Sequence, residues 1–422
     1  MPKIGDMQSR HFPTPLIWIF RILVGGVFII SGLAKNLDPW GFIYKIEDYL
    51  SVWGWDIPRT IVLTGALCLS TFEFVSGCML AVGCYRRIVP RLMLALMGAF
   101  MLPLTLYILI KDPVDDCGCF GDFIVLSNFW TFAKNVVITG MLIPLVIYNN
   151  RINGLYHSAL QWIIGVVTTL YIGAVGLLSY LVQPMIDFRP YPEGASIVAE
   201  EQNDNITFVY EKDGIEYEFG IDDLPEDETY SFVGRKGGEE SGARLTIFDP
   251  ATEEDVTEEV LTDDGRQLLL IMSEPARADL SDTYVINELN DYLQEHDCEM
   301  IALIAAGPEK IAEWQNLSMA EYPCYMADDT QLKELVRGIM SMIFVEDGII
   351  KWKRTISSID LKKVEKVTSG ESDINELRFN GKGIFASLSV GLLSLLGMIW
   401  VLQIISLIIL RRKATHPGSD KQ

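Results

Sequence analysis

The sequence predicts a membrane-embedded α-helical bundle joined to an acidic α/β domain. Of the 422 residues, 50% are hydrophobic, yet the formal net charge is −22. These two properties occupy different parts of the chain. Residues 187–382 hold 45 Asp and Glu against 18 Lys and Arg, whereas the remainder holds 11 against 16. The acidic balance argues against nucleic-acid binding, which needs a basic surface.

Six apolar runs predict transmembrane helices, because a helix of about 20 apolar residues is long enough to span the hydrocarbon core of a bilayer. They are residues 15–33, 60–82, 88–110, 129–148, 160–182 and 384–410. The first run has no small-residue cleavage site, so we expect a retained helix and not a signal peptide.

The basic residues predict the orientation of these helices. Arg86, Arg87 and Arg91 lie between the second and third runs, Arg151 lies between the fourth and fifth, and residues 411–413 follow the sixth. Lys and Arg concentrate in cytoplasmic loops. We therefore expect a protein of the bacterial inner membrane with both termini in the cytoplasm. The loop 35–59, the loop between the third and fourth runs, and the acidic domain would then be periplasmic.

The loop between the third and fourth runs is the strongest candidate for chemistry. Residues 115–122 read Asp-Asp-Cys-Gly-Cys-Phe-Gly-Asp, with Cys117 and Cys119 one residue apart. A disulfide between them would close a very small ring, and strained, exposed disulfides are the labile or catalytic ones. Lys134, at the start of the following run, would lower the pKa of one thiol. The alternatives are a structural disulfide or tight turn, and a metal site, which lacks histidines nearby.

Two ionisable residues interrupt the apolar runs. Arg21 lies in the first run and Glu73 in the second. A charge within a bilayer usually has a partner, so we predict an Arg21–Glu73 ion pair. It would act either as a clamp between two helices or in a proton or quinone reaction.

The acidic domain begins with strand signals and continues with strand–helix alternation. Residues 207–210 and 216–219 flank Asp213-Gly214 and predict a hairpin, and two further strands are expected at 230–233 and 244–248. The later strands are 268–272, 300–305 and 322–326, the helices are 282–295, 308–317 and 330–337, and a final hairpin joins 342–346 to 349–353. This order predicts an α/β sheet.

Cys298 and Cys324 stand at the starts of two of these strands. In an oxidising compartment they would form a structural disulfide if their Cα atoms came within about 7 Å.

Residues of the first apolar run, of the cysteine loop and of the fourth apolar run resemble those of known membrane proteins. The pattern Arg21, Gly25, Phe28, Ser31, Gly32, Lys35, Asp38, Phe42 resembles the start of DoxX-like proteins. The sequence Cys117-Gly118-Cys119-Phe120-Gly121, followed by Phe132-Ala133-Lys134-Asn135, resembles the methylamine-utilisation MauE branch, which usually has Arg-Asn where this chain has Lys134-Asn135. The resemblance covers residues 15–150. It implies a four-helix DoxX-like core tied to thiol or quinone redox, with quinone as the candidate cofactor, but nothing here indicates methylamine.

The acidic domain resembles the thioredoxin-like domains of periplasmic thiol reductases, and the whole chain resembles the long Bacteroidetes versions of these membrane proteins. The expected C-x-x-C is replaced by Ser273-Glu274-Pro275-Ala276-Arg277, and the expected proline by Gly338-Ile339. We therefore expect a degenerate domain that binds partners and does not catalyse dithiol exchange.

These observations divide the chain into five parts: a four-helix membrane domain at 1–150, a fifth helix at 151–186, a β-rich segment at 187–260, a thioredoxin-like domain at 261–382, and a last helix with its tail at 383–422. Two functions fit. Either Cys117 and Cys119 pass electrons between periplasmic protein clients and a quinone, or the protein is a non-enzymatic scaffold. A transporter using Arg21 and Glu73 is a third option, without a substrate signal, and the sequence carries no signal for the oligomeric state.

Overall fold

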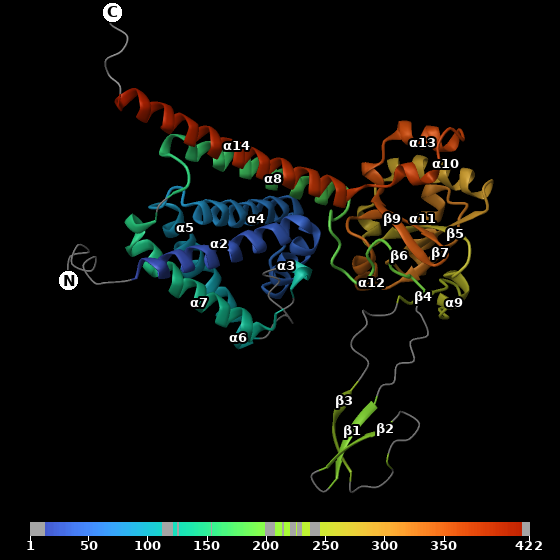
Figure 1. Ribbon diagram of the computed structural model, residues 1–422. Coiled ribbons are helices and arrows are strands. Elements are labelled where there is room, and N and C mark those ends of the chain that lie inside the picture. Colours follow the sequence, from blue (N-terminus) through green and yellow to red (C-terminus); the bar gives the residue numbers. More distant parts are fainter. Residues whose placement is uncertain are drawn as a thin grey trace, which may run out of the picture. The chain divides into compact units, whose positions relative to one another are not determined.

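The computed structural model describes residues 13–111, 121–124, 126–152, 154–198, 207–212, 215–219, 225, 230–236 and 245–415. The chain divides into two compact units. One comprises Met1–Phe188 and Asn380–Gln422, and the other comprises Arg189–Phe379. The first unit is a helical bundle and the second is an α/β domain (Figure 1). The α/β domain is therefore an insertion between the fifth and sixth long helices of the bundle.

Among the described residues, six helical segments are long and apolar enough to cross a membrane. They are α2 (Thr14–Leu37), α4 (Arg59–Val82), α5 (Val89–Leu96) continuing through the π-helical turn η1 (Met97–Met101) into α6 (Leu102–Lys111), α7 (Asn128–Ile147), α8 (Gln161–Leu181) and α14 (Gly381–Thr415). The six predicted runs are confirmed, and the protein is a multi-pass membrane protein.

Helices α2 and α4 pack with their backbones in contact. A Cβ atom added to Gly32 would lie 2.4 Å from the Phe74 nitrogen and 2.6 Å from the Ser70 oxygen. A Cβ atom added to Gly77 would lie 2.7 Å from the Ile29 nitrogen. Small residues allow such close approach in lipid, where van der Waals packing drives helix association. These contacts fix which residues of α2 face which residues of α4.

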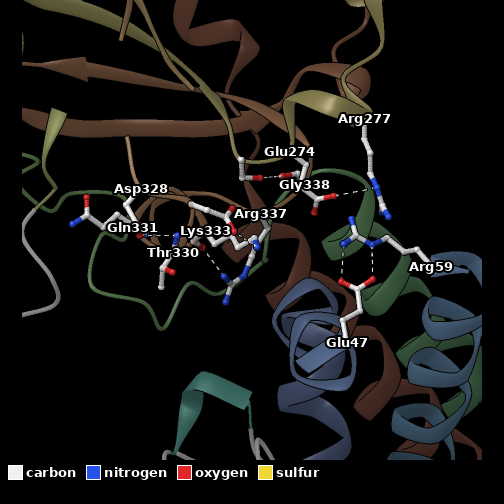
Figure 2. Close-up of polar contacts among 12 residues, drawn as sticks. Glu47, Arg59, Glu274, Arg277, Asp328, Thr330, Gln331, Lys333, Arg337 and Gly338 are labelled. Carbon is white, nitrogen blue, oxygen red and sulfur yellow. Dashed lines mark hydrogen bonds and ion pairs between the residues drawn. The ribbon is translucent and has the colours of Figure 1, made fainter. Parts of the chain in front are cut away.

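A short helix, α3 (Pro39–Val52), stands where the sequence suggested a loop. Its apolar residues form one stripe, with Trp40 and Ile43 buried, so the segment lacks the continuous hydrophobicity that marks a span. The Arg59 guanidinium donates to both carboxylate oxygens of Glu47 at 2.8 and 2.6 Å (Figure 2). The same guanidinium lies 5.5 Å from the Trp40 ring centroid. These contacts fasten α3 to the start of α4.

Helix α14 lies along α8 (Figure 1). Polar contacts join the two within an apolar surface. Tyr171 and Ser389 share a hydrogen bond of 2.8 Å between their hydroxyls, and the Tyr156 hydroxyl donates to the Leu396 carbonyl at 3.0 Å. The helix therefore belongs to the bundle although the α/β domain separates it from α8 in sequence.

The α/β domain contains a mixed six-stranded sheet in the order β4-β7-β6-β5-β8-β9. The strands are β4 (Ile247–Phe248), β5 (Arg266–Met272), β6 (Cys298–Ile304), β7 (Cys324–Ala327), β8 (Met340–Glu346) and β9 (Ile349–Thr355). Strands β5, β6 and β7 are parallel, whereas β8 runs antiparallel to β5 and to β9. This is a thioredoxin-like arrangement, and it confirms the predicted fold class.

Helices cover both faces of this sheet. The helices are α9 (Thr257–Val260), α10 (Thr283–Gln294), α11 (Pro308–Ser318), α12 (Asp329–Leu335) and α13 (Leu361–Thr368). Residues of α10, α11 and α13 share one hydrophobic core with Leu268 and Leu270, and residues of α9 and α12 share the other with Leu269 and Ile271. Central strand β5 is thus buried on both faces, as its unbroken apolar sequence indicates.

A separate three-stranded sheet has the order β2-β1-β3, with β1 (Thr207–Lys212), β2 (Ile215–Phe219) and β3 (Ser231–Lys236). Antiparallel pairing of Tyr210 with Tyr217 confirms the predicted hairpin. The structure divides the segment 187–260, because β4 joins the large sheet and Ser196 forms a bridge to Ile349 of β9.

The predicted disulfide between Cys298 and Cys324 is wrong. In the parallel pairing of β6 with β7, Cys324 lies opposite Ala302, four residues beyond Cys298. Four strand residues span about 13 Å, which exceeds the Cα separation of about 7 Å that a disulfide tolerates. Both cysteines are free thiols and buried.

We predict that Gly32→Ala destabilises the bundle by roughly 1–3 kcal/mol, because its Cβ would meet the α4 backbone. The matched control is Gly26→Ala, where an added Cβ meets no atom within 4 Å and better helix propensity makes the change neutral or slightly favourable. Thermal unfolding in nanodiscs compares the two variants. Equal melting temperatures would show that the α2–α4 contact is looser than described.

We predict that Cys298 and Cys324 are alkylated after unfolding without any reductant, and resist alkylation in the folded protein. Burial raises the pKa of each thiol to about 11, so at neutral pH neither thiol supplies much of the reactive thiolate. Mass tagging under native and denaturing conditions measures both states. If alkylation of the unfolded protein required a reductant, the two cysteines would form a disulfide after all.

Candidate functional site

A buried ion pair joins α2 to α4 inside the bundle. The Lys35 ammonium donates to both Glu73 carboxylate oxygens, at 2.8 Å to Oε1 and 2.7 Å to Oε2. The Ser31 hydroxyl donates to Glu73 Oε2 at 2.8 Å. Lys35 and Glu73 are only 3% and 4% exposed. Ser31 and Lys35 are one helical turn apart, so α2 presents both donors to the same carboxylate.

The predicted Arg21–Glu73 ion pair is wrong. Arg21 donates from Nε to the Leu80 carbonyl at 2.9 Å and from a terminal nitrogen to the Ala81 carbonyl at 2.6 Å, and its guanidinium lies 4.2 Å from the Trp18 ring centroid. Glu73 precedes Leu80 by seven residues, or about 10 Å of helix. The backbone contacts of Gly32 and Gly77 set this register, so Glu73 faces the end of α2 that carries Lys35.

The sequence analysis named Lys35 only in the DoxX-like pattern and missed it as the partner of Glu73, because the first apolar run was ended at residue 33. The structure continues α2 to Leu37, which places Lys35 in its last turn. The signal was present in the spacing, since Ser31 and Lys35 fall four residues apart on the stripe that contains Phe28 and Gly32. A basic residue on the buried stripe of a span, and not on its lipid face, calls for an acidic partner.

The ion pair borders a small cavity of about 30 Å³ between α2, α4, η1 and α7. Its walls combine charged, polar, aromatic and thioether side chains. They are Val27, Phe28, Ser31, Lys35, Glu73, Met97, Met101, Lys134, Asn135 and Ile138. The structure therefore brings Lys134, which the sequence analysis linked to the cysteine loop, to the same cavity as Lys35 and Glu73.

Neighbouring contacts hold the cavity walls in place. The Asn135 amide donates to the Thr105 hydroxyl at 3.4 Å, which ties α7 to α6. The Lys35 ammonium lies 4.9 Å from the Phe42 ring centroid, within cation–π range. Met97 and Met101 belong to the π-helical turn, and single π turns inside α-helices occur frequently at functional sites.

Cys117 and Cys119 lie outside the described residues. The described chain on either side of them ends at Lys111 of α6 and resumes at Gly121. Lys134 is six residues into α7 and Thr105 is six residues before Lys111, so each lies about 9 Å along its helix from the loop-bearing end. Lys134 and Thr105 thus lie roughly two helical turns from Asn128 and Lys111, the described ends of α7 and α6. The turn η2 (Gly121–Phe123), which closes this loop, packs against α2 and α3.

The α/β domain carries hydrogen-bonded polar groups where a thioredoxin-like enzyme carries its dithiol. The Ser273 hydroxyl, directly after β5, is buried and donates to the Gly338 carbonyl at 2.9 Å. Figure 2 shows Glu274 and Arg277 beside Gly338, with the Glu274 carboxylate 3.5 Å from the Arg277 guanidinium. Gly338 has φ +94° in place of the expected proline. Among the described residues, neither 273–277 nor 338–341 includes a cysteine.

We predict that Lys35→Met and Glu73→Gln each destabilise the bundle by about 3–5 kcal/mol, because each leaves a buried polar partner unpaired. The double variant should cost less than the sum of the two. The control cycle pairs Arg21→Met with Glu73→Gln and should be additive. Unfolding free energies in mixed micelles measure both cycles. A coupling energy between Arg21 and Glu73, with none between Lys35 and Glu73, would show that Arg21 is the partner of Glu73.

Comparisons with known families match two parts of the chain. Residues 13–148 match the family described as methylamine utilisation protein MauE, and residues 205–237, which include the small sheet, match a domain of unknown function, DUF8463. No curated protein matches the sequence. The DoxX-like resemblance of the first helix stays a prediction.

Several solved structures show remote likeness. A thiol peroxidase from Chromobacterium violaceum is 12% identical, with 30% of this chain and 83% of that chain covered and a TM-score of 0.23. Mycobacterium tuberculosis AhpC is 11% identical, with 44% and 98% covered and a TM-score of 0.23. A putative thioredoxin reductase from Burkholderia cenocepacia is 12% identical, with 39% and 86% covered and a TM-score of 0.21. The thioredoxin-like assignment stands on the strand order. Residues 13–148 thus resemble the MauE family, and the same chain contains a thioredoxin-like α/β domain.

Proposed function

We propose that the protein is an inner-membrane thiol oxidoreductase that exchanges electrons between Cys117 and Cys119 and a membrane quinone, in the disulfide maturation of periplasmic clients. The observation that carries the proposal is the charged cavity inside the bundle. Ionisable groups are costly inside a membrane and mark reaction paths or substrate sites. Here Lys35, Glu73 and Lys134 line one cavity between helices, and α7, which forms one of its walls, is joined in sequence to α6 by the segment that contains Cys117 and Cys119.

The proposed reaction balances electrons and protons. When Cys117 and Cys119 form a disulfide, two S–H bonds break, and two electrons and two protons leave the pair. The quinone accepts two electrons and two protons and becomes a quinol. In the reverse reaction, electrons and protons pass from the quinol to the cysteine pair and then to a client disulfide. Either direction needs groups that move protons near the loop, and Lys134 and the ion pair are placed to do so.

Lys134 would also control the reactivity of the cysteine pair. Its ammonium group favours a nearby thiolate, which is the nucleophile in disulfide exchange. The aspartates of the loop, Asp115, Asp116 and Asp122, oppose ionisation of the thiols by like-charge repulsion. A cation at position 134 therefore has a task that either lysine or arginine performs.

Orientation and client binding complete the proposal. The basic loops around Arg86 and Arg151 would face the cytoplasm, with both termini. The cysteine loop and the α/β domain would then share the periplasmic side. Ser273 replaces the first thiol of a thioredoxin-like site, so the α/β domain would hold client proteins and leave the thiol chemistry to the loop.

The alternative function is a membrane scaffold without catalysis. One observation favours it: both oxygens of the Glu73 carboxylate accept hydrogen bonds from Lys35, and one also accepts from Ser31. Such bonds are those expected of a clamp between two helices. In that case the cysteine loop would be structural, and the α/β domain would bind periplasmic partners.

We predict that Cys117 and Cys119 form a mixed oxidised and reduced population in cells, shifted towards the disulfide when the quinone pool is oxidised. Acid quenching followed by mass tagging and mass spectrometry of the loop measures the ratio. Cys117→Ser with Cys119→Ser should abolish client oxidation at normal expression, whereas Cys68→Ser, an exposed thiol of α4, should have no effect. A pair that stays fully oxidised whatever the quinone state would favour the scaffold.

We predict that Lys134→Met slows thiol alkylation in the reduced loop by about tenfold, which corresponds to one pKa unit. Lys134→Arg should keep the wild-type rate because it retains the charge. The measurement is the alkylation rate of the loop as a function of pH. Equal rates for all three proteins would remove Lys134 from the mechanism.

A further inference from the structure

We propose that Glu73 is a proton-exchanging group, and that the cavity beside it is a hydrated path by which a proton passes between the Lys35–Glu73 pair and Lys134. Lys35 and Ser31 act as positioning residues for the carboxylate. This inference concerns the cavity alone and holds whether or not the cysteine pair is redox-active.

The chemistry of the cavity walls favours water. Apolar cavities of proteins stay dry, whereas polar ones hold water that bonds to two to four groups. This cavity is bordered by the Lys35, Glu73 and Lys134 side chains, the Ser31 hydroxyl and the Asn135 amide. Its volume of about 30 Å³ has room for about two water molecules. Water and protons are the species for which this volume and this polar lining are suited.

The ion pair has a second state that differs only by the position of one proton. If a proton moves from Lys35 Nζ to a Glu73 oxygen, one N–H bond breaks, one O–H bond forms, and two opposite charges become two neutral groups. The donor and acceptor are 2.7 and 2.8 Å apart, which is normal hydrogen-bond distance. Burial of two charges in a low-dielectric interior is costly, and this narrows the free-energy difference between the two states.

A cavity water can carry a proton between Lys134 and Glu73. The Lys134 ammonium gives up a proton by breaking an N–H bond, the water carries a proton across, and the Glu73 carboxylate gains it in a new O–H bond. The reverse steps restore the ammonium and the carboxylate. No electron moves in these steps. These proton transfers require an ionisable group on the wall of the cavity opposite Glu73, and Lys134 lines that wall.

The other elements around Glu73 add little charge. Helix α2 contributes Lys35, α7 contributes Lys134, and η1 contributes the thioethers of Met97 and Met101. Helix α8, which packs against α4, contains no Asp, Glu, Lys or Arg. Helix α3 also packs against α4 and carries Lys45, Glu47 and Asp48, but none of these three lines the cavity. The charged groups that line the cavity with Glu73 are therefore two lysines from two different helices.

The test is infrared difference spectroscopy of the full chain in lipid nanodiscs, with spectra recorded across the pH range in which the protein stays folded, in H₂O and in D₂O. We expect a carboxylic acid C=O band that changes with pH and shifts in D₂O, because its proton exchanges with the cavity. The band should be missing in Glu73→Gln. It should persist in Glu47→Gln, the matched control, since Glu47 also pairs with a cation but lies outside the cavity.

A second variant assigns the band even if Glu73→Gln fails to fold. Ser31→Ala keeps the ion pair and removes one hydrogen bond to the carboxyl group, so the frequency of the band should shift. Ser70→Ala is its control, because the Ser70 hydroxyl bonds to the Leu67 carbonyl of its own helix. The absence of any carboxylic acid band that responds to Ser31→Ala or Glu73→Gln would show a permanently ionised clamp and overturn the proposal.

Discussion

The backbone contact between α2 and α4 is the constraint on which the membrane domain depends. Gly32 and Gly77 let the two helices meet without intervening side chains, so neither helix can slide along the other without a clash. That register places Lys35 and Ser31 opposite Glu73. The same register carries Arg21 past Glu73 to the carbonyls near the end of α4. Position along a helix, rather than the presence of opposite charges, therefore decides which groups pair.

The sequence predicted the helices of the bundle well, and their mutual register poorly. Hydrophobicity and length identify a span because the bilayer imposes both. The Arg21–Glu73 error arose because these two were the charged residues within the predicted runs, whereas Lys35 lay beyond the end assigned to the first run; α2 runs on to Leu37. Helix α3 was missed because its buried stripe of Trp40 and Ile43 is too narrow to resemble a span. This stripe is buried by packing against α4 and α8.

The α/β domain shows the same division between local and non-local information. Alternating strands and helices were readable from residues 266–355, since each strand is an apolar run bounded by polar turns. The distance between Cys298 and Cys324 could not be predicted from the sequence, because the pairing of the two strands sets it. Ala302, and not Cys298, lies opposite Cys324. The loss of thiol chemistry at Ser273 was visible in the sequence. Its hydrogen bond to Gly338 required the fold, which brings the end of β5 to the turn before β8.

Under the proposed function, the two units would separate tasks that a thioredoxin-like enzyme unites. In such an enzyme one site provides both the thiols and the surface that binds the client. Here the α/β domain keeps the sheet, with buried Ser273 bonded to Gly338, while the paired cysteines and the buried charges belong to the membrane unit. A thiol reaction has to dispose of protons as well as electrons. Under the proposed function the bundle would serve both needs, since apolar carriers would reach it from the lipid and its interior holds Lys35, Glu73 and Lys134 around one polar cavity.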